Sequence, residues 1–168
     1  MSNQQTDETN QYLTFSLDNE IFALDITQVR EVLELATVTR IPRTPEFMRG
    51  VINLRGHAVP VVDMRRKFGM PPVEDTVDTC IVITEVNLGG ESAVIGALVD
   101  SVREVFEMLP EGIEPAPRMG MSIRTDFIHG MGKQNDNFVI ILDINRIFSS
   151  EELAVLSATD DQEAAEAV

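Results

Sequence analysis

The sequence contains few of the residues that build disulfide, metal or redox sites. Its 168 residues include one cysteine, Cys80, so no disulfide can form within the chain. The two histidines, His57 and His129, have no partner at metal-ligand spacing, and no cysteine pair exists to complete a zinc site. We therefore predict no metal and no cofactor. The apolar run that begins at Cys80 predicts a buried thiol in a reduced, cytoplasmic protein.

Long apolar segments and positive charge are also scarce. No uninterrupted apolar stretch approaches the roughly 20 residues that a helix needs to span a bilayer, and no basic-then-apolar leader follows Met1. The formal net charge is −15, from 13 Lys and Arg against 28 Asp and Glu. Binding to nucleic acid or to an anionic membrane needs a concentrated positive surface. We expect a cytoplasmic protein that binds no nucleic acid and does not insert into the membrane.

Catalytic motifs are missing as well. No Gly-x-Ser-x-Gly motif supplies a hydrolase nucleophile, and the stretch 130–133 lacks the first glycine and the final Ser or Thr of a phosphate-binding loop. Asp63 and Asp143 each precede a short helical pattern, which predicts that they cap helices. The alternative is an enzyme that uses Asp63, Asp143, Arg55 and Lys133, which would need these groups to converge in one pocket with perturbed ionisation.

The sequence does contain an internal repeat. Three segments of one half of the chain return in the other half in the same order: Val29–Val32 as Val102–Val105, Phe47–Gly50 as Phe127–Gly130, and Val59–Phe68 as Val139–Phe148. The spacing between the second and third segments is the same in both copies. The chain is therefore predicted to be a duplicated module, and function is expected where the copies differ.

Apolar residues alternate with polar ones between turn residues, which is typical of half-buried strands. The pattern predicts four hairpins, in segments 12–24, 51–62, 78–99 and 127–142. Pro60 cannot donate to a strand ladder, so its strand is predicted to lie at an edge or to carry a bulge. Asp25 is predicted to cap a short helix that has Val29, Val32 and Leu33 on its apolar side.

About ten strands and three or four short helices predict an all-β fold made of two small subdomains. We assign residues 1–10 to a disordered tail, 11–158 to a single domain and 159–168 to an acidic tail. The two halves of the domain are about 11–72 and 78–148, and exchange of strands between them is left open. Ser149–Glu152 has the form of a capping box, which predicts a C-terminal helix.

Positive charge gathers in one segment of this acidic chain. Seven of the 13 cations lie between positions 40 and 67: Arg40, Arg43, Arg49, Arg55, Arg65, Arg66 and Lys67. This segment is either a face for an acidic protein partner or an ordinary solvated surface. Arg55 lies at a tight corner that exists in one copy only. It either pairs with an acid such as Glu31 or recognises a partner, and one arginine is able to do both.

The segment Ile41–Arg65 resembles the signature of the CheW chemotaxis coupling proteins, and the resemblance extends from about residue 11 to residue 156. It implies two five-stranded, SH3-like β-barrels packed together, with short helices and a C-terminal helix. It also implies a non-enzymatic adaptor between the cytoplasmic tips of methyl-accepting chemoreceptors and the regulatory domain of the histidine kinase CheA. The implied protein is a stand-alone monomer that joins receptor–kinase arrays at membrane-associated receptor clusters.

The same resemblance implies a receptor-binding site and no catalytic residue. Positions tied to coupling in the family match Val29, Glu31, Gly50, Arg55 and Gly56. To these we add Val32, next to Val29, and the second-copy counterparts Val102 and Gly130; Val29 and Val102 are expected to flank a groove between the barrels. The kinase-binding surface is not identified. The alternative function is a coupling protein of a chemosensory pathway whose output is not flagellar motility.

Overall fold

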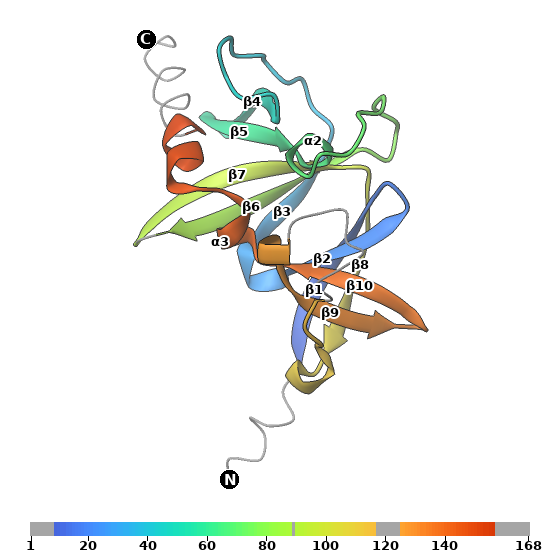
Figure 1. Cartoon of the computed structure of the whole chain (residues 1–168). Coiled ribbons are helices and arrows are strands. Elements are labelled where there is room, and N and C mark those ends of the chain that lie inside the picture. Colours follow the sequence, from blue (N-terminus) through green and yellow to red (C-terminus); the bar gives the residue numbers. More distant parts are fainter. Residues whose placement is uncertain (1–8, 89, 117–124, 157–168) are drawn as a thin grey trace.

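The computed structural model describes residues 9–88, 90–116 and 125–156 (Figure 1). The acidic tail predicted at 159–168 and most of the tail predicted at 1–10 lie outside these residues, and Asn10 already belongs to the first strand. The described chain forms two five-stranded sheets with a few short helices, which confirms the predicted all-β fold class. No helix in these segments is long and apolar enough to cross a membrane.

We call the two sheets the first and the second barrel. The first barrel has the strand order β3-β6-β7-β5-β4. Its strands are β3 (Val29–Glu34), β4 (Met48–Leu54), β5 (His57–Asp63), β6 (Cys80–Leu88) and β7 (Glu91–Val99). The second barrel has the order β8-β1-β2-β10-β9. Its strands are β1 (Asn10–Leu17), β2 (Glu20–Asp25), β8 (Ser101–Met108), β9 (Ile128–Gln134) and β10 (Asn137–Leu142).

The barrels are closed by the segments that follow β3 and β8. Thr39 bridges to Val51 of β4, and Glu114 bridges to Met131 of β9, so each edge strand continues around to the opposite edge of its sheet. Gly50 lies where the first of these segments crosses β4. A Cβ atom at this glycine would stand 2.2 Å from the Thr39 carbonyl oxygen, so no side chain fits there.

The sheets do not follow the division of the sequence at about residue 75. The first hairpin, β1–β2, comes from the first half of the chain but pairs with β8 and β10 of the second half. Figure 1 shows this blue hairpin among the yellow and orange strands of the lower sheet. Strands are therefore exchanged between the two sequence halves, so that neither barrel is a contiguous copy.

The two copies agree in local detail. The β4–β5 and β9–β10 pairs are interrupted at the same place, next to Gly50 and Gly130. The N–H of Asp63 donates to the Phe47 carbonyl at 2.7 Å, and the N–H of Asp143 donates to the Phe127 carbonyl at 2.9 Å. The repeat read from the sequence is thus a repeat of structure.

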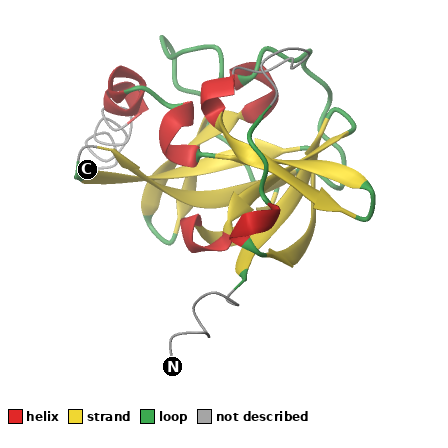
Figure 2. Cartoon of the chain, turned by 60° about the horizontal axis from the view of Figure 1, so that its bottom comes forward, coloured by secondary structure: helices red, strands yellow, loops and turns green. Residues whose placement is uncertain are grey.

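The short helices are held by polar caps, as predicted. The side chain of Asp63 caps α2 (Met64–Lys67), and that of Asp143 caps α3 (Ile144–Ile147). A helix covers residues 150–156, and Ser149 and Glu152 exchange the two hydrogen bonds of a capping box, at 2.8 and 3.1 Å. Three 3-10 turns complete the helices, η1 (Ile26–Gln28), η2 (Pro110–Gly112) and η3 (Thr125–Phe127). In Figure 2 these helices lie outside the strands.

The predicted helix after Asp25 is wrong. Asp25 does cap, because its carboxylate accepts from the Thr27 N–H at 2.9 Å, but only the 3-10 turn η1 follows. The chain then becomes strand β3, which pairs with β6. The spacing of Val29, Val32 and Leu33 fits a helix, but these β-branched and apolar residues also suit a strand, and pairing decided between the two.

Two further predictions differ from the structure. The strand that contains Pro60, β5, lies inside its sheet between β4 and β7 and not at an edge. The bulge in its ladder with β4 lies opposite Val61 and Val62, next to Pro60 and not at it. Pro60 is tolerated because the ladder with β7 begins only at Val61. The Cys80 side chain is half-buried and donates to the Asp78 carbonyl at 3.1 Å, so it is less buried than its apolar run predicts.

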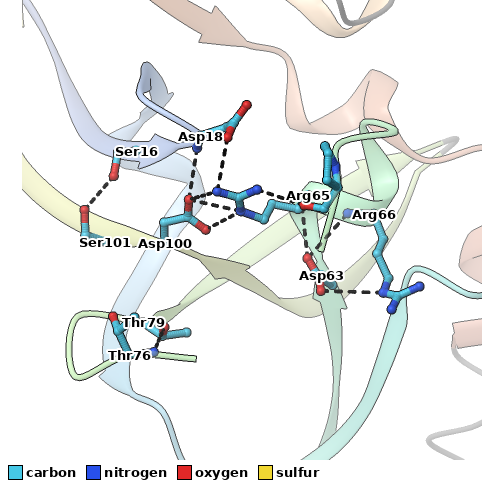
Figure 3. Close-up of polar contacts among 10 residues, drawn as sticks. Ser16, Asp18, Asp63, Arg65, Arg66, Thr76, Thr79, Asp100 and Ser101 are labelled. Atoms are coloured by element: carbon cyan, nitrogen blue, oxygen red, sulfur yellow. Dashed lines mark hydrogen bonds and ion pairs between the residues drawn. The ribbon is translucent and has the colours of Figure 1, made fainter. Parts of the chain in front are cut away.

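One core is shared by both barrels. Four phenylalanine rings form a chain through it, with centroids 5.8 to 5.9 Å apart: Phe15, Phe22, Phe68 and Phe127. Polar contacts also cross between the barrels. The buried Arg65 of α2 binds Asp100 with its Nε at 2.8 Å and its Nη2 at 2.7 Å, and its Nη2 lies 3.5 Å from Asp18 in the β1–β2 turn (Figure 3). The barrels are therefore one folded unit.

Candidate functional site

Strand β3 presents a mixed face at the edge of the first barrel. It pairs with β6 on one side only and lies at the end of its sheet. Along the strand, Arg30, Val32 and Glu34 are exposed, whereas Val29, Glu31 and Leu33 are half-buried. Val32 is 40% exposed and is the large apolar side chain that this strand presents to solvent. Val29 and Val32 therefore have different environments and do not share one apolar side.

Next to this strand, Arg55 forms a two-pronged ion pair with Glu31. The guanidinium donates from Nη1 to Oε2 at 2.7 Å and from Nη2 to Oε1 at 2.9 Å. These hydrogen bonds lower the pKa of Glu31 and raise that of Arg55. Of the two alternatives for Arg55, pairing with Glu31 is therefore observed, and recognition of a partner stays a prediction. The Arg55 side chain nevertheless stays 70% exposed, so the pair holds it in a fixed position that solvent can reach.

The turn that carries Arg55 explains its position. Leu54 pairs with His57, which leaves Arg55 and Gly56 as a two-residue loop with φ angles of 53° and 87°. Positive φ at both residues is the geometry that fits the twist of a hairpin, and glycine adopts it without a steric cost. The side chain of Asn53 accepts from the Gly56 N–H at 2.8 Å and fixes the corner.

The second barrel has the same turn with different chemistry. Asn135 and Asp136 occupy it, also with positive φ angles, so this corner is as tight as the first. Glu104 of β8 stands where Glu31 stands in β3, and it accepts from the Gln134 side chain at 3.5 Å. An arginine held by a glutamate at this turn, which we call the braced arginine, therefore occurs in the first barrel and not in the second.

The other predicted site residues are distributed over both barrels. Val29 and Val102 are half-buried and both pack against the shared core. Gly50 and Gly130 are packing positions, because a Cβ at Gly130 would stand 2.4 Å from the Ile113 side chain and one at Gly50 would overlap Thr39. Of the predicted set, Glu31, Arg55 and Gly56 lie together at the β4–β5 turn, and Val32 follows Glu31 in β3 with its side chain on the opposite side of the strand.

The cluster of seven cations is largely neutralised within the protein. Five of them form ion pairs: Arg49 with Asp75, Arg55 with Glu31, Arg65 with Asp100, Arg66 with Asp63, and Lys67 with Glu152. Arg40 and Arg43 make no ion pair within the described residues. The segment is therefore not one continuous basic face, and the interpretation as an ordinary surface fits better.

The environment of Lys67 was not predicted from the sequence. Its Nζ donates to Glu152 at 2.9 Å and lies 4.8, 5.5 and 5.7 Å from the ring centroids of Phe47, Phe127 and Phe148. Burial acts to raise the pKa of Glu152, but hydrogen bonds from Lys67 and Ser149 outweigh it and keep the pKa below its usual value. Lys67 therefore connects α2, in which it lies, to the second barrel through Phe127 and to the C-terminal helix through Glu152.

The four groups named for an enzyme do not form one site in the structure. Asp63 and Asp143 are used as helix caps, and Arg55 and Lys133 belong to different barrels. In the part of the chain that the structure covers, no group of three or more His, Cys, Asp or Glu side chains is arranged to hold a metal ion. The arrangement suits binding through an exposed edge strand and a rigid turn.

Residues 11–152 match the family model of the CheW-like domain. The chain belongs to the CheW-like family. It is 37% identical over 146 residues to the chemotaxis protein CheW of Klebsiella aerogenes, covering 87% of this chain and 86% of that protein. It is 31% identical over 151 residues to the CheW of Bacillus subtilis, covering 89% of this chain and 92% of that protein.

A solved structure agrees with both the family and the fold. The crystal structure of the scaffolding protein TtCheW from Thermoanaerobacter tengcongensis superposes with a TM-score of 0.76 at 36% identity, covering 86% of this chain and 91% of that one. Membership of the CheW-like family confirms the resemblance drawn from the sequence. It assigns the chain to a class of chemotaxis scaffold and adaptor proteins, which work by binding and not by catalysis.

Proposed function

We propose that this chain is a non-catalytic adaptor that couples the cytoplasmic tips of methyl-accepting chemoreceptors to the histidine kinase CheA. The observation that carries the proposal is the difference between two otherwise matching corners. The first barrel holds an exposed arginine that donates two hydrogen bonds to Glu31, and the second barrel has Asn135 and Asp136 there. The repeated fold does not need this arginine, so we assign it to a partner.

The receptor site in this proposal is the edge formed by β3 and the β4–β5 turn, with Glu31, Val32, Arg55 and Gly56. Val32 supplies exposed apolar area on one side of the edge strand, and Arg55, held by Glu31 on the other side, supplies hydrogen-bond donors. Arginine is enriched among the residues that dominate protein interfaces. Because Glu31 already fixes the guanidinium, little side-chain entropy is lost when a partner binds.

An adaptor needs a second surface for the kinase. The second barrel exposes three large apolar side chains, Val105, Leu109 and Phe138, each more than two-fifths accessible. We propose that the kinase contact draws on these residues, on the barrel that lacks the braced arginine. Simultaneous binding at the two barrels would convert two separate associations into one assembly with a high effective concentration.

Reconstitution tests this function. Receptor-containing membranes, CheA and the purified chain are combined in pairs and all together, and kinase autophosphorylation is measured. We expect strong activation only in the complete mixture, because a bridge acts through simultaneous engagement. Equal activation of CheA by the chain without receptor would show an allosteric activator in place of a bridge. A fluorescent fusion is expected at receptor clusters in cells and to spread evenly when receptors are deleted.

A further inference from the structure

A cavity of about 580 Å³ opens between the upstream halves of β5 and β7. The parallel ladder between these strands joins only Val61–Asp63 to Gly96–Leu98. In the second barrel the matching ladder begins one residue earlier, at Ile140 opposite Phe22. Pro60 occupies that position in the first barrel and has no N–H to extend the ladder, so the strands separate there and leave the space open.

The cavity has an apolar floor and a cationic rim. Buried side chains form the floor, among them Val59, Pro60, Ile95 and Leu156 from the C-terminal helix. Figure 1 shows this helix beside the ends of β5 and β7. Among the described residues of the lining, the charged or titratable ones are Arg30, Arg55 and His57. The carboxylates of Glu31 and Glu85 lie next to the two arginines. Apolar walls with a few polar groups at the rim are typical of binding sites.

Both arginines retain hydrogen-bond donors for a partner. Glu31 accepts from two of the five N–H groups of Arg55. Arg30 forms an ion pair with Glu85, but the carboxylate oxygen lies 3.7 Å from Nε, so no hydrogen bond joins them. The Arg30 side chain is 55% exposed. A partner carboxylate at the rim would therefore meet two guanidinium groups that have donors to spare.

We infer that this cavity is a docking site for a partner segment that carries a carboxylate beside apolar side chains. Hydrogen-bond donors select the occupant: the described lining has two arginines, each next to one carboxylate and each with N–H groups that this carboxylate does not use. The apolar side chains of the segment would cover the floor around Pro60 and Ile95, and its carboxylate would bind Arg30 and Arg55. The inference rests on the proposed function for the source of the segment, a component of the coupled assembly.

A tryptophan reporter tests the site directly. The chain has no tryptophan, so Ser92→Trp at the cavity wall gives a single fluorescent probe in an exposed position. Three short acetylated and amidated peptides are titrated: one that repeats Glu-Leu-Leu-Glu, one with glutamine for each glutamate, and one with serine for each leucine. We expect the first to bind about tenfold more tightly than either of the others.

The matched variants are Arg30→Gln and Arg103→Gln, since Arg103 is the counterpart of Arg30 in the other barrel. Arg30→Gln should weaken binding of the acidic peptide about tenfold, and Arg103→Gln should leave it unchanged. Equal binding of the acidic and glutamine peptides would overturn the inference, as would equal losses in both variants. Displacement of the peptide by millimolar inorganic phosphate alone would also overturn it, because the site would then select phosphate.

The reconstituted assembly separates this inference from the proposed function. If the wild-type chain couples receptor to kinase and Arg30→Gln reduces coupling, both stand. If coupling is normal but the reporter detects no acidic peptide, the docking site is wrong and the adaptor function stands. If the reporter binds the peptide in the predicted order but no coupling occurs, the adaptor function is wrong and the cavity remains a site for acidic, apolar segments.

Discussion

The two barrels share strand order, bulges, capped helices and tight turns, but they differ in where they place charge. At three equivalent positions the first barrel has Arg55, Arg65 and Lys67, and the second has Asn135, Asn145 and Ile147. Two of the three cations hold the molecule together, and the third is exposed. The comparison shows that a charged residue peculiar to one copy is not by itself a functional residue; its exposure must be known as well.

The contacts of α2 and α3 show what the different charges do in the two copies. Residues 65 and 145 occupy equivalent positions in these helices, and the side chain of each contacts the other barrel. Arg65 of α2 binds Asp100 and approaches Asp18, whereas the side chain of Asn145 in α3 accepts from the Asn87 N–H at 2.7 Å. The Arg65–Asp100 contact is ionic and partly buried, whereas the Asn145–Asn87 contact is a single neutral hydrogen bond. We therefore expect the first contact to contribute more to stability than the second.

The largest effect is predicted for Arg65→Met. This change leaves the partly buried Asp100 without its main partner, which should lower the free energy of unfolding by about 3 kcal/mol in urea titrations. Asn145→Ala, the matched change, should cost about 1 kcal/mol. Equal losses of unfolding free energy in the two variants would show that the two contacts contribute equally to stability.

The same pair gives a pH dependence. Burial acts to raise the pKa of Asp100, but hydrogen bonds from Arg65 and from the Asp18 N–H lower it below its usual value. This stabilisation is fully present above the unfolded-state pKa and is lost as the pH falls through the lower folded-state pKa. The stability gap between wild type and Arg65→Met should therefore narrow in acid.

Gly50→Ala should destabilise the fold by about 2 kcal/mol or more, because its Cβ would overlap the backbone of Thr39. Gly56→Ala should cost about 1 kcal/mol, since its φ is 87° but no atom lies within 4 Å of the added Cβ. Thermal unfolding of both variants measures the difference. If Gly50→Ala is fully stable yet fails to bind receptor, this glycine is an interface residue.

Lys67→Met gives the first copy an apolar side chain like that of Ile147 and removes the partner of Glu152. We expect a loss of about 1 kcal/mol and faster amide exchange in residues 150–156, measured by hydrogen exchange. Arg66→Met, at the exposed neighbouring position, is the control and should leave exchange in the helix unchanged. Unchanged exchange in Lys67→Met would show that apolar contacts of the helix suffice to hold it.

Val32→Asp tests the exposed face of β3. The side chain is 40% exposed, so the fold should persist while receptor binding weakens by more than about 1 kcal/mol. Val105→Asp, its counterpart in the second barrel, should leave receptor binding intact. Val29→Asp is a poorer test, because Val29 packs against the shared core and its charge would also cost stability.

The smallest effect on stability is expected for Arg55→Ala. The side chain is largely exposed, so unfolding should be almost unchanged, whereas receptor-dependent kinase activation should fall. Asn135→Ala, at the matching corner of the second barrel, should leave both unchanged. Normal activation with Arg55→Ala would remove the basis for assigning this arginine to a partner.

Local features of the fold were predictable to different degrees. The turns, the caps at Asp63 and Asp143 and the capping box were predicted correctly, because each depends on residues within a few positions of one another. The segment after Asp25 was not, because its spacing fits both a helix and a strand. Of the candidate site, the Glu31–Arg55 pair was one of two alternatives considered for Arg55, whereas Lys67 and Arg30 were missed. The repeat does place Lys67 opposite the apolar Ile147, which is a signal that Lys67 is enclosed.

By itself, the sequence determined that the chain is a duplicated all-β module and that it resembles the CheW family, since alternation, turns and signature residues are local properties. The tertiary structure decided which half supplies each strand and which cations are neutralised. Strands β1 and β6 hold equivalent places in the two barrels and have similar apolar faces, because the sequence is repeated. The local pattern of apolar residues therefore cannot decide to which barrel each of them belongs. Asp100 and Glu152 are 35 and 85 positions from their partners Arg65 and Lys67, and only the folded chain brings such charges within hydrogen-bond distance.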